Sequence, residues 1–88
     1  MRRRYRSIAG IIYDILVCVE RGSDTVTAIS TCANLPYDRA KSLVERLIEK
    51  GFLEKGSSNK LYLTEKGKAV MNKLKELRDL MEALGFKL

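Results

Sequence analysis

The residues best suited to chemistry in this sequence are cations, which fall into three groups along the chain. The first is the N-terminal stretch "MRRRYRS", with Arg2, Arg3, Arg4 and Arg6. The second lies in "LPYDRAKSLVER", and the third places a lysine on either side of the polar stretch "GSSN". Guanidinium and ammonium groups bind phosphates, so this pattern indicates a polyanionic partner.

The overall composition agrees with such a partner. The 88 residues include 17 Lys and Arg against 11 Asp and Glu, which gives a net charge of +6. A small basic domain suggests nucleic acid first, although some proteins are basic without such a partner. Hydrophobic residues make up 45% and charged residues 32%, the balance of a globular domain with one modest core.

Catalytic and metal sites lack the residues that they need. The sequence has no histidine, which excludes histidine acid–base catalysis and Cys/His zinc sites. It has no phosphate-binding loop or nucleophile–base arrangement, so we expect no enzyme and no cofactor. Cys18 and Cys32 fall on or near apolar helix faces, which favours packing over a redox role. A disulfide between them requires their helices to cross at these positions, a question that the sequence leaves open.

The N-terminal stretch is basic and then apolar, superficially like a secretion signal. Asp14 and Glu20 interrupt its apolar part, and no convincing cleavage site follows. No apolar run approaches the ~18 residues of a membrane span. We therefore expect a cytoplasmic protein associated with the nucleoid.

Apolar periodicity predicts helices in the first half of the chain. The first runs from about Tyr5 to Arg21, and its apolar residues recur at three- and four-residue steps: Ile8, Ile11, Ile12, Ile15, Leu16 and Val19. Gly22 ends this helix. A second, short helix is capped by Ser23 or Asp24 and stops at Asn34.

The second half of the chain adds a helix, a hairpin and a last helix. Pro36 suits the first turn of a third helix, which runs to about Lys50. "FLEK" and "KLYL" read as short strands around the turn "GSSN". Thr64 caps the last helix. We expect a mainly α fold with a small β-hairpin: a winged helix-turn-helix domain over residues 1–66 and a C-terminal dimerisation helix over residues 67–88.

In a helix-turn-helix unit the second helix of the pair enters the major groove of DNA. Here that is the third helix, whose outer side carries Tyr37, Arg39, Lys41, Ser42 and Arg46. Arg39 could read guanine through two hydrogen bonds, and Lys41 or Ser42 could hold a phosphate or a base edge. The alternative is a solvated helix face with pairs such as Lys41–Glu45.

The hairpin and the N-terminal arm add candidate phosphate contacts. The wing offers Lys55, Ser57, Ser58, Asn59 and Lys60. The arm offers Arg2, Arg3, Arg4 and Arg6, which could follow the backbone or enter a minor groove. The alternatives are a solvated turn and a solvated tail.

Apolar residues of the last helix follow a coiled-coil pattern. Val70, Leu74, Leu77, Met81 and Leu84 are spaced four, three, four and three residues apart, and Leu80 widens the seam. This face could instead pack on the domain's own core. A helix that leaves so small a domain would expose its later leucines, so we expect a homodimer. Lys73 would lie near Arg78 of the partner subunit in a parallel pair, which favours an antiparallel one.

Three stretches give the sequence a family resemblance over nearly its whole length: "RSIAGIIYDIL", "NLPYDRAKSLVERLIEKGFLEK" and "YLTEKGKAVMNKLKEL". It resembles the small archaeal winged-helix DNA-binding proteins of the "ten-a" type. The resemblance implies binding of double-stranded DNA through the third helix and wing, dimers joined by an antiparallel coiled coil, and a chromatin-type or regulatory role. Two features depart from the family: Pro36 replaces a polar cap, and the C-terminal helix is short.

The function expected from these observations is a dimeric DNA-binding protein, either a transcription regulator or an architectural chromatin protein. Two other classes remain open. A winged helix can serve as a protein-interaction module within transcription machinery. A small RNA-binding domain is the other, although Tyr37 and Tyr5 alone offer aromatic surfaces for base stacking.

Overall fold

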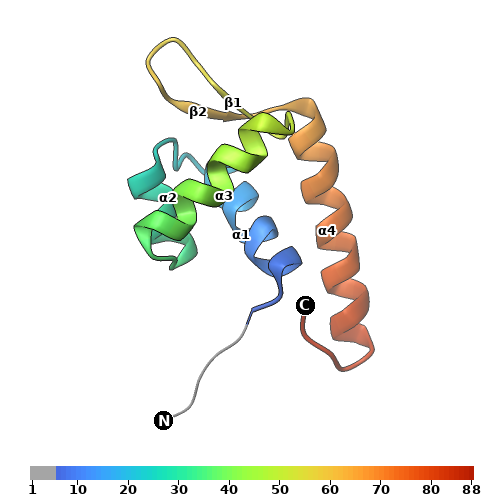
Figure 1. Ribbon diagram of the computed structural model, residues 1–88. Helices are drawn as coiled ribbons and strands as arrows, with labels where there is room; N and C mark the ends of the chain where they lie inside the picture. Colours follow the sequence, from blue (N-terminus) through green and yellow to red (C-terminus); the bar gives the residue numbers. More distant parts are fainter. Residues whose placement is uncertain (1–5) are drawn as a thin grey trace.

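The structure is a computed structural model that describes residues 6–88, and this part of the chain forms four helices and a two-stranded hairpin (Figure 1). In chain order the elements are α1 (Ile8–Glu20), α2 (Val26–Ala33), α3 (Tyr37–Glu49), β1 (Leu53–Lys55), β2 (Leu61–Leu63) and α4 (Glu65–Ala83). This order confirms the predicted winged helix-turn-helix architecture. The predicted contacts of Arg2, Arg3 and Arg4, and the helix start at Tyr5, lie outside the described residues.

Helix α1 is central, because α2, β2 and α4 all pack on it. It begins at Ile8, after the predicted start, since the hydroxyl of Ser7 accepts a hydrogen bond from the Gly10 N–H at 3.0 Å and caps the helix. Ile8 is 57% exposed, so the predicted stripe is wrong at its first member. Tyr13 and Cys18 are buried instead, because α1 is covered on more than one side.

The core lies where α1, α2, α3 and the hairpin meet. Its most deeply buried large side chains are Ile15, Leu16, Ile29, Val44 and Leu53. They come from four different elements, so the helix-turn-helix pair and the wing share one core.

The cap of α2 differs from the prediction. Thr25, rather than Ser23 or Asp24, accepts the hydrogen bond from the Ala28 N–H at 3.1 Å. Asp24 serves the wing instead: its carbonyl accepts a hydrogen bond from the Leu61 N–H at 2.9 Å. Asp24 therefore fixes the position of β2 against the segment that leads into α2.

The connection between α2 and α3 is tight. Asn34 adopts the left-handed conformation, with φ 56°, and stops α2 as predicted. The prediction placed Pro36 in the first turn of α3, whereas in the structure it precedes the helix as its N-cap residue. Its carbonyl still accepts the Ala40 N–H at 2.9 Å, so the absence of a polar cap leaves the helix start intact.

The hairpin pairs β1 with β2 in antiparallel register, with Leu53 opposite Leu63 and Lys55 opposite Leu61. Leu53 and Leu61 face the core, while Glu54 and its partner Tyr62 face outward. Only the base of the wing is therefore held by apolar packing.

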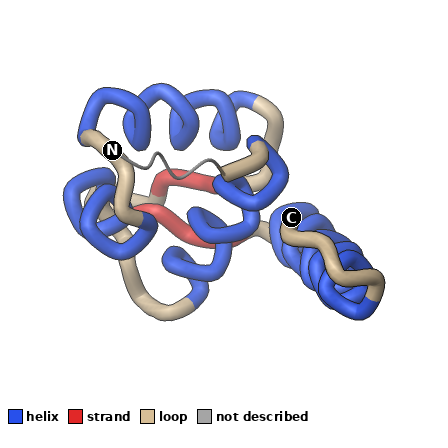
Figure 2. The backbone as a smooth tube through the Cα atoms, turned by 90° about the horizontal axis from the view of Figure 1, so that it is seen from below, coloured by secondary structure: helices blue, strands red, loops and turns tan. Residues whose placement is uncertain are grey.

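Helix α4 begins with the predicted cap, because the Thr64 hydroxyl accepts a hydrogen bond from the Gly67 N–H at 2.9 Å. Gly67 is buried against the base of the hairpin, and a Cβ there would collide with the carbonyl oxygen of Phe52. Met71 then joins the core, with Val70 and Leu74 packed against it. The later part of α4 extends to one side of the other three helices (Figure 2).

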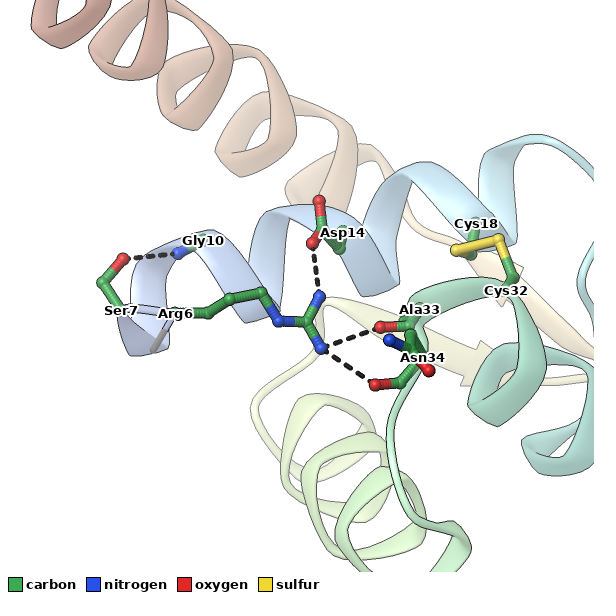
Figure 3. A network of polar contacts seen from close by, with 8 residues as sticks. All are labelled: Arg6, Ser7, Gly10, Asp14, Cys18, Cys32, Ala33 and Asn34. Carbon is green, nitrogen blue, oxygen red and sulfur yellow. Dashed lines mark hydrogen bonds and ion pairs between the residues drawn. A yellow bond between two sulfur atoms is a disulfide. The ribbon is translucent and has the colours of Figure 1, made fainter. Parts of the chain in front are cut away.

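Two links join α1 to the end of α2, as Figure 3 shows. Cys18 and Cys32 form a disulfide, with their Cα atoms 6.0 Å apart. The Arg6 guanidinium pairs with the Asp14 carboxylate at 2.8 Å and donates to the carbonyl oxygens of Ala33 and Asn34 at 2.8 and 3.2 Å. The helices thus cross at the cysteines, the condition that the sequence left open.

Candidate nucleic-acid interface

Helix α3 has a buried side and a polar side. Ala40, Val44 and Leu47 are buried in the core. All five predicted DNA-contacting residues of this helix are exposed: Tyr37, Arg39, Lys41, Ser42 and Arg46. The helix therefore offers its polar side to solvent, as a recognition helix must.

In the described part of the chain, the cations of this face make no close ion pair with a carboxylate. Among residues 6–88, no ion pair within 4.0 Å involves Arg39, Lys41, Arg46 or Lys55. The alternative pairing of Lys41 with Glu45 is therefore not formed. These charges remain available to an anionic partner.

A groove of about 300 Å³ joins the recognition helix to the wing. Tyr37 and Lys41 line it from α3, and Lys55 and Asn59 line it from the hairpin. The two pairs come from different elements of the chain, and the fold gathers them on one concave surface. Four apolar side chains and one carboxylate also line it: Val26, Val44, Ile48, Leu61 and Glu45.

The start of α2 forms the third wall of this groove, which sequence reasoning missed. Thr25 and Thr27 both line it. The Thr25 hydroxyl accepts from Ala28 as the cap of α2, which leaves its own proton free to donate to a phosphate. The signal in the sequence was a threonine pair at the start of the first helix of a helix-turn-helix unit.

Three predicted residues of α3 do not line this groove: Arg39, Ser42 and Arg46. Ser42 and Arg46 border a separate depression together with Glu45 and Glu49. These two carboxylates disfavour a phosphate at that place. Arg39 borders neither hollow, and its position in the first turn of α3 fits contact with a base edge.

The predicted residues of the wing are all exposed: Lys55, Ser57, Ser58, Asn59 and Lys60. Lys60 lies 3.6 Å from the Asp24 carboxylate, and both side chains are open to solvent, so this pair is weak. Asn59 turns the chain at the tip with φ 60°. The tip therefore carries polar groups without any apolar anchor.

Arg6 does not belong to a free basic arm, which corrects the prediction for this residue. Its guanidinium is committed to the Asp14 carboxylate and to the carbonyl oxygens of Ala33 and Asn34. Release of Arg6 to a phosphate would leave those carbonyls without this donor. We therefore assign Arg6 to the positioning of the turn between α2 and α3.

The predicted dimerisation seam of α4 is divided by the fold. Val70 and Leu74 pack against the domain's own core, which is the alternative that the sequence allowed for this face. Met81 is half-buried. Leu77, Leu80 and Leu84 are exposed by 40%, 56% and 61%, and Phe86, absent from the prediction, is 60% exposed beyond the end of the helix.

Two further searches concern the described residues. Between residues 6 and 88, no group of three or more His, Cys, Asp or Glu side chains is placed to hold a metal ion. None of the helices in that same part of the chain is long and apolar enough to cross a membrane.

Comparison with known proteins identifies relatives of both sequence and structure. A family model described as winged helix-turn-helix matches residues 5–82. An uncharacterized protein of Methanocaldococcus jannaschii is 34% identical over 82 residues, which cover 93% of this chain and 84% of the relative.

Solved structures agree with this family. Sso10a-2, described as a DNA-binding protein from Sulfolobus solfataricus, matches with a TM-score of 0.76 and 26% identity over 90% of this chain and 85% of its own. The transcriptional repressor CouR, bound to p-coumaroyl-CoA, shares the fold with a TM-score of 0.68 and 22% identity over 92% of this chain and 63% of its own. The predicted resemblance to small archaeal winged-helix DNA-binding proteins is confirmed, and the chain belongs to the winged helix-turn-helix family.

Proposed function

We propose that this protein binds double-stranded DNA as a homodimer and serves as a transcription regulator or an architectural chromatin protein. The observation that carries the proposal is the groove in which Lys41 of α3 meets Lys55 and Asn59 of the wing. Neither lysine is held by a carboxylate, so both are free to release counterions from DNA. The proposal includes no catalytic role.

The residues of the interface divide into two roles. Arg39 reads a base edge in the major groove, where the start of α3 enters. Lys41, Lys55 and the wing tip contact phosphates, which positions the helix without specifying sequence. The Thr25 hydroxyl adds a phosphate contact at the start of α2.

The proposed dimer joins two copies through the later part of α4. Leu77, Leu80 and Leu84 form an exposed apolar stripe, which a second copy would cover. An antiparallel pair keeps Lys73 away from Arg78 of the partner subunit. The pairing places two recognition helices on one DNA duplex, so a specific site would be palindromic.

A protein partner is the second candidate. Tyr37 is 50% exposed and borders the apolar lining of the groove. Exposed tyrosines are enriched at protein interfaces, so this surface could receive a protein segment. Little affinity for nucleic acid would follow from that role.

The test measures binding to random duplex DNA, and to sequences enriched from the same pool, across a salt series. We expect log Kd to depend steeply on log salt, with a slope that becomes shallower by about 1 for each of Lys41→Ala and Lys55→Ala. Lys75→Ala, on α4, is the matched control and should leave the slope unchanged. Strong enrichment of one palindrome indicates a regulator, and its absence indicates an architectural protein. No binding at low salt contradicts the proposal and supports a protein partner.

A further inference from the structure

Helix α2 is the shortest helix of the interface. It has eight residues, of which only Ile29 and Ala33 are buried. Val26, Thr27 and Thr31 are β-branched, and such residues have low helix propensity. Contacts made by its ends therefore add to the packing that holds α2 in place.

The last turn of α2 is held by two links to α1. The disulfide joins Cys32 to Cys18, and the Arg6 guanidinium binds the carbonyl oxygens of Ala33 and Asn34 immediately after it (Figure 3). Both links act on the end of α2 that leads into the turn before α3. They fix where the recognition helix begins.

The disulfide connects two functional parts of the molecule. Cys18 belongs to α1, which packs against β2 and α4. Cys32 belongs to α2, which packs against α3 and contributes Thr25 and Thr27 to the groove. One covalent bond therefore joins α1, on which β2 and α4 pack, to the helix pair α2 and α3 of the proposed DNA interface.

The two cysteines differ in exposure. Cys18 is 4% exposed and belongs to the core, whereas Cys32 is an exposed residue of α2. We therefore expect a thiolate from solution to attack the disulfide at the Cys32 sulfur, with the Cys18 sulfur as the leaving group. The more exposed cysteine is the one in the helix pair of the proposed DNA interface.

We propose that the Cys18–Cys32 disulfide is a redox switch for the position of α2 and, through it, for DNA binding. The proposal rests on the proposed function for its effect on DNA. The reductant is a dithiol. One of its thiolates attacks the Cys32 sulfur to form a mixed disulfide, and the Cys18 thiolate leaves and takes a proton. The second thiolate of the reductant then attacks the reductant's own sulfur in the mixed disulfide, and the Cys32 thiolate leaves and takes a proton. Two electrons and two protons are thereby transferred, and the reductant becomes a disulfide.

Reduction leaves α2 formed but less firmly held. Ile29 stays in the core and Arg6 keeps its two carbonyl contacts, so the domain retains its fold. The unfolded chain loses the constraint of a closed loop, since the cysteines are 14 residues apart. We expect the melting temperature to fall by about 10–20 °C. Local opening of α2 then becomes frequent at temperatures where the rest of the domain is intact.

The first experiment measures whether the disulfide is accessible in the folded protein. We expect dithiothreitol to reduce it under native conditions. Single cysteine variants then separate the two sulfurs: Cys32 in Cys18→Ser should react with iodoacetamide at least ten times faster than Cys18 in Cys32→Ser. A disulfide that resists reduction until the protein unfolds would make the bond purely structural and would overturn the proposal.

The second experiment compares oxidised protein, reduced protein and the double variant Cys18→Ser/Cys32→Ser, at a temperature where circular dichroism shows all three folded. We expect reduced protein to bind one DNA duplex at least fivefold more weakly than oxidised protein. The double variant should bind like the reduced form and ignore dithiothreitol. Should the double variant not fold, reduced and alkylated wild-type protein takes its place.

Amide hydrogen exchange makes the outcome independent of DNA. We expect amides of α2 to exchange at least ten times faster after reduction, while those of α1 change little. Equal affinity or equal exchange in the oxidised and reduced forms would overturn the switch. If no form binds DNA but α2 exchange still responds to reduction, the proposed function fails and the redox control of α2 stands without it.

Discussion

The exposed side of α3 and the exposed side of the later part of α4 have opposite chemistry. Outside the core, α3 presents Arg39, Lys41 and Arg46, whereas α4 presents Leu80 and Leu84. A solvated helix requires neither an excess of cations nor an apolar stripe on its outer side. The difference teaches that the two exposed sides suit different contacts under the proposed function: a polyanion matches the cations of α3, and an apolar surface matches the leucines of α4.

The largest effect is expected from a charge placed in the exposed apolar stripe of α4. Leu80→Glu places a charge in the middle of the exposed stripe, and the proposed dimer would bury this charge once in each subunit. We expect the dimer to lose about 3–6 kcal/mol, since each buried leucine contributes about 1.5–3 kcal/mol. Sedimentation equilibrium should then report a monomer. Asn72→Glu, at an exposed position of α4 about two turns before Leu80, should leave the mass of the dimer unchanged.

This variant also tests whether the two surfaces are independent. Leu80→Glu should retain salt-sensitive binding to random DNA, because the groove contains no residue of α4. Wild-type protein that already sediments as a monomer would refute the homodimer.

The next largest effect is expected at Gly67, where α4 packs against the base of the hairpin. Gly67→Ala introduces a Cβ that collides with the Phe52 carbonyl oxygen, and backbone cannot yield as a flexible side chain can. We expect a loss of about 3 kcal/mol in the free energy of unfolding, measured by denaturant titration. Lys68→Ala, an exposed neighbour, should change it by less than about 0.5 kcal/mol. A Gly67→Ala protein as stable as wild type would mean that α4 does not cross the hairpin base so closely.

The smallest effect is expected on the exposed basic side of α3, at Arg39. Arg39→Ala should cost about 1–3 kcal/mol on an enriched DNA site and little on random DNA, because a base contact specifies sequence. Fluorescence anisotropy on both duplexes separates these cases. Equal weakening on every duplex would make Arg39 a phosphate contact. Arg46→Ala should have less effect, since Glu45 and Glu49 share its depression.

Sequence reasoning predicted what local signals determine. The order of the elements, the cap at Thr64 and the left-handed stop at Asn34 were all readable, because each depends on neighbours within a few residues. The same holds for the outer side of α3, since helical spacing places Ala40, Val44 and Leu47 together on the buried side.

The features that sequence reasoning missed depend on residues distant in the chain. Arg6 reads as one more cation of a basic arm until the carbonyls of Ala33 and Asn34 lie beside it. Tyr13 is buried where α1 meets α4, and the Arg78 guanidinium lies 4.9 Å from the centre of its ring. Such contacts follow from the packing of elements, which periodicity within one element does not contain.

The hydrogen bond from Leu61 to Asp24 divides the wing into a fixed base and a free tip. Residues 57–59 lie beyond both that bond and the paired strands. Doubling the length of such a loop adds only about 0.6 kcal/mol to the free energy of its closure. Insertions at the tip could therefore extend the reach of the wing while leaving the helix pair in place, which makes this turn the natural point for grafting a new recognition loop onto the domain.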